Sequence, residues 1–184
     1  MLTEFNTERG AIDGLWVVTM KQVGDDRGTV RELFRRSAFE AAGVGLDHIE
    51  QVNLTQTRKG AVRGMHAESM TKLVTVAHGS AHGIYVDTRR ASPSFGEVEE
   101  VSLEVGIQVL VPSGVANGFQ ALSDAAQYAY CFDTEWSPGM PGLAFTPLDP
   151  IVVDRWPLPF DSGSTEFLSV KDLQAPTFDE VVRT

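Results

Sequence analysis

The chain has 184 residues and a net charge of −10, from 15 basic and 25 acidic side chains. This charge would repel a polyanion and argues against general nucleic-acid binding, and no window approaches the roughly 20 apolar residues that span a bilayer. The length fits a single domain over residues 1–184, because single cores usually run to about 100 to 200 residues.

Short β-type runs separated by Gly, Pro, Asn and Asp follow one another along the chain. Six of them lie between Ile49 and Phe132 with no helix-length pattern between them, which is typical of an antiparallel jelly roll. We expect helices only over 37–43, with Ser37 as cap and Gly43 as stop, and after Ser169; residues 137–150 should form an ordered loop. The predicted strands cover 15–20, 29–34, 48–57, 72–79, 81–88, 97–105, 108–113, 127–132 and 151–156.

The N-terminus favours a cytoplasmic protein, and the cysteine content limits the kinds of site that the chain can form. Residues 1–16 lack the basic start and apolar run of a signal peptide. Cys131 is the single cysteine, which excludes an internal disulfide and a multi-cysteine zinc site. It lies in the apolar run AAQYAYCF, so we interpret it as a core residue and not as a catalytic thiol.

Two stretches resemble the paired motifs of the cupin superfamily: RGMHAESMTKLVTVAHG (63–79) and GIQVLVPSGVANGF (106–119). The second has Asn117 where metal cupins usually carry a histidine, and the first has one histidine where they carry His-x-His. Only His66 and Glu68 would be offered as ligands, whereas a metal usually needs three or four. We therefore expect an all-β cupin barrel with no metal and no cofactor, in which His66 transfers a proton.

Several further segments together resemble the dTDP-4-dehydrorhamnose 3,5-epimerase family of cupins, from about Ile12 to Phe178. The resemblance implies an isomerase that moves a proton on the carbon beside the ketone of a dTDP-linked 4-keto-6-deoxy sugar. The segments are DDRGTVRELF (25–34), QVNLTQTRKGAVRGMH (51–66), KLVTVAHG (72–79), VDTRRASPSFGE (86–97), VPSGVANGFQAL (111–122), WSPG (136–139) and LSVKDLQAP (168–176).

The resemblance also implies roles for named residues. Such a reaction needs a base, a cation near the oxygen that gains negative charge, and an acid on the opposite face of the ring. His66 would be the base, Asp172 the carboxylate that orients it, and Lys72 the cation that stabilises the enolate. Asp172 could instead cap the terminal helix, and Asp87 is a weaker candidate for a carboxylate in the pocket. The residues implied in substrate binding are Arg27, Glu32, Gln51, Asn53, Arg63, Asn117 and Trp136.

Several residues differ from the usual pattern of this family, so the chain would be a divergent member. The resemblance places the general acid, usually a tyrosine, at Trp136, and an indole N–H is not a usable proton donor at neutral pH. Tyr128 or Tyr130 could replace it, and we assign the catalytic role to Tyr130. Thr29 and Val30 stand where aromatic residues that pack near thymine are common, and HAESMTKLV is shorter than the usual HxQ-containing stretch.

These departures leave alternatives open. Proton return could be altered, which would give epimerisation at one carbon only or an isomerisation. The chain could instead be a non-catalytic sugar-nucleotide-binding homologue, or a cupin isomerase or cyclase recruited to another carbonyl substrate. The resemblance further implies a homodimer in which Arg27 acts across the interface.

Overall fold

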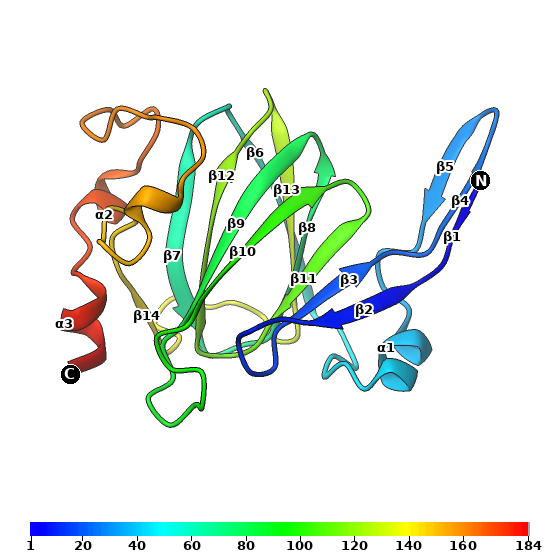
Figure 1. The fold of residues 1–184 in the computed structure, drawn as a ribbon, viewed down its shortest axis with the longest axis horizontal. Coiled ribbons are helices and arrows are strands. Elements are labelled where there is room, and N and C mark those ends of the chain that lie inside the picture. Colours follow the sequence, from blue (N-terminus) through cyan, green and yellow to red (C-terminus); the bar gives the residue numbers. More distant parts are fainter. Residues whose placement is uncertain (184) are drawn as a thin grey trace.

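The computed structural model describes residues 1–183, and its main secondary structure is antiparallel β-sheet (Figure 1). The largest sheet has six strands in the order β2-β3-β11-β8-β13-β6. Its strands are β2 (Asn6–Arg9), β3 (Trp16–Thr19), β6 (Gln51–Thr57), β8 (Lys72–His78), β11 (Ile107–Val111) and β13 (Ala126–Phe132).

A second sheet faces the first and has the order β10-β9-β12-β7-β14. Its strands are β7 (Val62–Glu68), β9 (Ser80–Asp87), β10 (Val98–Glu104), β12 (Val115–Ala121) and β14 (Gly142–Ala144). The two sheets close around an apolar interior as a jelly-roll barrel, which confirms the predicted cupin fold.

Three short N-terminal strands form an arm that projects from the barrel at the end opposite the C-terminal helices (Figure 1). They are β1 (Leu2–Thr3), β4 (Gln22–Asp25) and β5 (Gly28–Arg31). The helices are α1 (Arg36–Ala42), the short 3₁₀ helix η1 (Val153–Arg155), α2 (Val170–Leu173) and α3 (Phe178–Arg183). None of the helices in the described part of the chain has the length and apolar character needed to span a bilayer.

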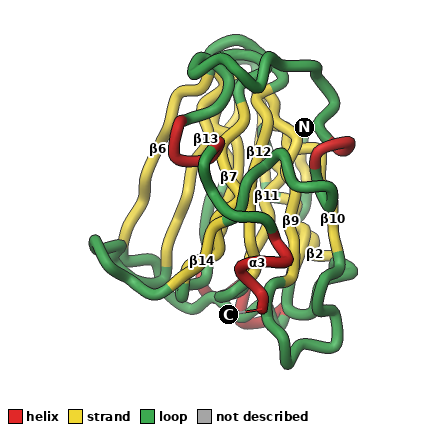
Figure 2. The backbone as a smooth tube through the Cα atoms, turned by 90° about the vertical axis from the view of Figure 1, so that its left-hand side faces the viewer, coloured by secondary structure: helices red, strands yellow, loops and turns green. Residues whose placement is uncertain are grey.

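Neighbouring residues of one strand belong to different apolar clusters. In β8, Leu73 packs under α1 on the outside, whereas Val74 packs in the barrel interior. In β9, Ile84 packs under the C-terminal segment, whereas Tyr85 points inward. Figure 2 shows that C-terminal segment crossing the outer face of the second sheet. Because both faces of these strands are buried, they read as continuous apolar runs.

Most of the predicted elements are present, but some boundaries are wrong. The strand predicted over 151–156 is wrong, because this segment contains the 3₁₀ helix η1. Just before η1, the carboxylate of Asp149 accepts hydrogen bonds from the backbone N–H groups of Ile151 and Phe178. The N-cap position of helix α1 is Arg35, whose side chain makes no capping hydrogen bond, so the prediction of Ser37 as the cap is wrong. Gly43 follows the last helical residue, as predicted, and adopts the left-handed conformation. The loop predicted over 137–150 contains β14. The strands that the sequence missed are β1, β2, β4, β7 and β12.

Candidate active site

Strand β7 brings Arg63 and His66 to the same side of the sheet. Side chains alternate along a regular strand, so residues three apart would face opposite sides. The pairing of β7 with β12 shifts between Asn117 and Phe119, which face His66 and Arg63 respectively. Three residue steps on β7 therefore match two on β12, which is a β-bulge, and both side chains line one cavity in the barrel.

Gly64 lies inside this bulge, at a φ of +136°. A Cβ atom there would stand 2.4 Å from the Cα of Gly118 and 3.0 Å from the carbonyl oxygen of Asn117. The close approach of the two backbones therefore requires glycine at this position.

His66 is held by a carboxylate from the far end of the chain. Its Nε2 lies 3.0 Å from Oδ1 of Asp172, and the Asp172 side chain is largely buried. Burial raises the pKa of Asp172, but its contacts with His66 and Ser169 outweigh that effect and leave the pKa below its usual value. Helix α2 positions Asp172, whose backbone N–H donates to Oγ of Ser169, the residue that caps the helix. Ser169 therefore caps helix α2, and the Asp172 side chain contacts His66 instead of capping the helix.

Lys72 is the first residue of β8 and is buried, with 2% of its surface exposed. Its Nζ donates to Oδ1 of Asn117 at 2.9 Å, to the carbonyl oxygen of His66 at 3.3 Å and to the carboxylate of Glu68. Burial lowers the pKa of Lys72, and Glu68 opposes that effect. A cation in low dielectric beside the histidine can stabilise negative charge that develops on a bound oxygen.

A cavity of about 180 Å³ opens between β6, β7, β8, β12 and β13 and brings most of the predicted residues together. Tyr130 lines this cavity. Tyr128 also points inward, but it lies in the closed core, where its ring stacks on Phe119 with 3.9 Å between the ring centroids. Burial raises the pKa of Tyr130, so its hydroxyl keeps its proton. The lining residues are Asn53, Thr55, Arg63, Gly64, His66, Glu68, Lys72, Asn117, Tyr130, Phe132 and Trp136.

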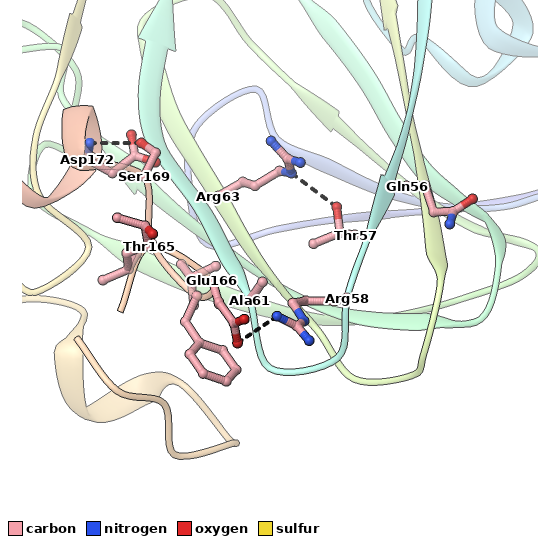
Figure 3. Close-up of a pocket in the computed structure, with 12 residues that line it drawn as sticks. Gln56, Thr57, Arg58, Ala61, Arg63, Thr165, Glu166, Ser169 and Asp172 are labelled. Atoms are coloured by element: carbon pink, nitrogen blue, oxygen red, sulfur yellow. Dashed lines mark hydrogen bonds and ion pairs between the residues drawn. The ribbon is translucent and has the colours of Figure 1, made fainter. Parts of the chain in front are cut away.

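A second hollow, of about 380 Å³, shares Arg63 with the first, and Figure 3 shows the residues that line it. Nε of Arg63 donates to Oγ1 of Thr57 at 3.0 Å, and Arg58 pairs with Glu166. Asp172 also lines this hollow. The guanidinium groups of Arg58 and Arg63 therefore both line this hollow, where an anionic part of a ligand could be bound.

Some predicted residues lie elsewhere. Arg27 is in the turn between β4 and β5, where it is exposed and pairs with Asp25, and Glu32 pairs with Arg35. Both belong to the region of the N-terminal arm and α1, and neither lines the cavity. Gln51 lies beside the cavity: it donates to Asn53 and accepts from the backbone N–H of Trp136.

Three further findings complete the comparison with the sequence. Asp87 is not in the cavity, because its carboxylate is bound by Arg89, Ser92 and Ser94 in a buried loop cluster. Glu68, which the sequence suggested only as a metal ligand, contacts Lys72. Its position two residues after His66 could have shown that the two side chains lie on the same face of a strand. Within residues 1–183 no group of three or more His, Cys, Asp or Glu residues is arranged to hold a metal ion.

A jelly-roll barrel whose cavity exposes a carboxylate-bound histidine, a buried lysine and a tyrosine defines a cupin with acid–base groups. The family model for dTDP-4-dehydrorhamnose 3,5-epimerase matches residues 9–180, and the chain belongs to this family.

Individual relatives agree with that assignment. The dTDP-4-dehydrorhamnose 3,5-epimerase of Mycobacterium tuberculosis is 33% identical over 177 residues, which cover 92% of this chain and 86% of that protein. The dTDP-4-dehydrorhamnose 3-epimerase of Streptomyces niveus is 31% identical and covers 89% of this chain and 79% of its own length. The dTDP-6-deoxy-D-glucose-3,5-epimerase of Legionella pneumophila, solved with dTDP-4-keto-L-rhamnose, superposes with a TM-score of 0.85 at 32% identity, covering 96% of this chain and 94% of that one.

Proposed function

We propose that the protein epimerises a dTDP-linked 4-keto-6-deoxy sugar by moving a proton on a carbon next to the ketone. The observation that carries this proposal is the Asp172-bound His66 in a cavity that also exposes Lys72 and Tyr130. The family assignment supplies the substrate class. Such a substrate combines an acidic C–H, an oxygen that gains charge and an anionic diphosphate, and the site offers a partner for each.

The proposed steps follow from the contacts. If Nε2–H of His66 donates to Asp172, then Nδ1 is the nitrogen that accepts the proton from carbon. The C–H bonding electrons form the enolate, and its oxygen is stabilised by the Lys72 ammonium, while Asp172 stabilises the imidazolium. Tyr130 then returns a proton to the opposite face of the carbon, which inverts it. Exchange with solvent resets both groups.

The diphosphate is proposed to lie at Arg63. Its guanidinium lines both hollows, so a ligand that fills the sugar cavity can continue past it toward Arg58. The planar guanidinium fork matches phosphate oxygens. Asn53 and Asn117 supply amide groups in the same cavity as partners for sugar oxygens, and Gln51 holds the segment of Trp136 that forms its rim.

We further propose a homodimer, in which the partner's arm completes the site. The arm exposes Val23 and Val30, the latter with 74% of its surface, and the edge strand β6 exposes Val52 and Leu54 on its outer face. Exposed apolar groups and unpaired strand edges favour association. Arg27 projects from the arm with 90% of its side chain exposed, so a partner's arm could present it to the diphosphate. The buried free thiol of Cys131 agrees with the reducing cytoplasm, where we place the protein.

Light scattering tests the dimer: the expected mass is twice the 20.0 kDa of one chain. Val30→Asp should shift the mass toward that of one chain. Epimerisation should then weaken, as it should in Arg27→Ala. A monomer at micromolar concentration, or full activity of Arg27→Ala, would contradict this part of the proposal.

The reaction itself is tested by incubation with dTDP-4-keto-6-deoxyglucose in deuterated water. We expect deuterium at carbon 3, at carbon 5 or at both, and nuclear magnetic resonance identifies which. A second candidate, a non-catalytic binding homologue, is favoured by Trp136 at the position predicted for the acid. It requires binding of dTDP without deuterium uptake and no effect of His66→Asn on that binding. The absence of uptake at both carbons would reject the proposed reaction.

A further inference from the structure

Glu68 occupies a position that the proposed mechanism does not use. It follows His66 by two residues on β7, so both side chains face the cavity. It also lines an outer hollow of about 420 Å³ with Trp136 and Lys171, so its carboxylate stands between the sugar cavity and the surface. Its carboxylate pairs with the ammonium of Lys72.

We propose that Glu68 is a positioning residue for the reaction: its carboxylate holds Lys72 in the charged ammonium form and aims Nζ at the cavity. This inference rests on the proposed function for its catalytic meaning. The contacts at Nζ support it independently. An ammonium group has three donors, and three acceptors surround Nζ, namely Glu68, Asn117 and the carbonyl oxygen of His66. A neutral amine has only two donors and would leave one acceptor without a partner.

Glu68 is the anionic group best placed to compensate this charge. The other titratable or charged groups in the cavity are Arg63, Tyr130 and His66. Arg63 is cationic and disfavours a second cation, and burial raises the pKa of Tyr130, so its hydroxyl carries no negative charge. The His66 ring is itself paired with Asp172, whereas Lys72 contacts the backbone carbonyl oxygen of His66. A lysine with 2% of its surface exposed loses its proton readily unless an opposite charge is close.

The pairing also explains how an oxygen can be bound. A ketone oxygen needs one of the three donors of Nζ, and the contact with the His66 carbonyl, at 3.3 Å, is longer than the 2.9 Å contact with Asn117. Replacing the longer contact keeps Nζ fixed by Glu68 and Asn117 while the third N–H points to the substrate. Without Glu68 the amine form would be populated, and a neutral amine stabilises an enolate poorly.

The test follows the ionisation of Lys72 directly in the free protein. The ε-carbon resonance of labelled lysine is titrated with pH and assigned by its absence in Lys72→Arg. Glu68→Gln keeps the shape and removes the charge, so the pKa of Lys72 should fall by at least about one unit. Glu68→Asp keeps the charge and should shift it by less than half as much. Glu104→Gln, a neutralised exposed carboxylate on β10, is the control and should leave the pKa where it is.

Kinetics provide the second measurement. Epimerase activity should be lost as pH rises through the pKa of Lys72, because the active ammonium form disappears there. In Glu68→Gln this loss should begin at a lower pH than in wild type, by the amount that the pKa of Lys72 has fallen. If Glu68→Gln does not fold, Glu68→Ser carries the same expectation. An unchanged pKa of Lys72 in the neutral variants, or equal shifts in Glu68→Asp and Glu68→Gln, would overturn the inference. A wild-type protein that takes up no deuterium overturns the proposed reaction instead, so the two failures can be told apart.

Discussion

The contact between His66 and Asp172 should determine the rate of proton abstraction, and Asp172→Asn tests it. Asparagine keeps the size and the backbone N–H that bonds to Ser169, so helix α2 should remain. The variant removes the charge that stabilises the imidazolium. Opposite charges about 4 Å apart attract by about 4 kcal/mol at an effective dielectric constant of about 20. The His66 side chain is 35% exposed, which reduces this attraction.

We therefore expect a loss of about 2 to 4 kcal/mol of transition-state stabilisation, or about 30- to 1,000-fold in rate. The assay is the initial rate of deuterium uptake by dTDP-4-keto-6-deoxyglucose. Asp179→Asn is the matched control, because Asp179 lies in the same C-terminal region with 70% of its side chain exposed. A rate within threefold of wild type in folded Asp172→Asn would refute the assignment of His66 as an oriented base.

Three other variants test the acid, a buried carboxylate and the bulge. Tyr130→Phe should still exchange the proton at His66 but form inverted product about 100- to 10,000-fold more slowly, measured by comparing deuterium uptake with product formation; equal losses in both would contradict the role of acid. Burial raises the pKa of Asp87, but hydrogen bonds, chiefly from Arg89, outweigh it and lower the pKa to about 2. Above pH 4 the ionised Asp87 carboxylate should therefore add about 2 kcal/mol to the free energy of unfolding, and this contribution is lost as pH falls to 2. The difference in free energy of unfolding between wild type and Asp87→Asn should shrink over the same pH window. Gly64→Ala should lower the free energy of unfolding by about 3 kcal/mol or more in denaturant titrations, because its Cβ would meet the backbone of Gly118; a loss below 1 kcal/mol would show that the bulge adapts.

The strands that the sequence predicted well are those with an uninterrupted apolar pattern. The run from Lys72 to Val76 is buried on both faces, so apolar residues occur on both faces of the strand and strengthen the signal. The run from Val62 to Glu68 was missed, because Gly64 interrupts it and Arg63, His66 and Glu68 reduce its apolar character. Those polar residues are the ones that form the site, so the strand of greatest functional interest gave the weakest structural signal.

The alternation rule was reliable where the strand is regular and misleading where it is not. Alternation along β13 puts Tyr128 and Tyr130 on one face, as the structure has them, but only the three-dimensional structure shows that Tyr130 alone of the pair lines the cavity. The rule would have separated Arg63 from His66, because a bulge changes the parity of the side chains that follow it. No local pattern marks that bulge with certainty, since an isolated glycine also occurs in turns.

The partner of His66 illustrates a limit of a different kind. Asp172 is 106 residues away, in a four-residue helix whose sequence is equally consistent with simple capping. Propensity and periodicity describe neighbours in sequence, so they could not bring these two side chains together; the family resemblance could, because it concerns whole chains. The same reasoning applies to Arg27 and Glu32. Their predicted role depends on a surface of a second chain, and a single chain leaves both in the arm, paired with Asp25 and Arg35.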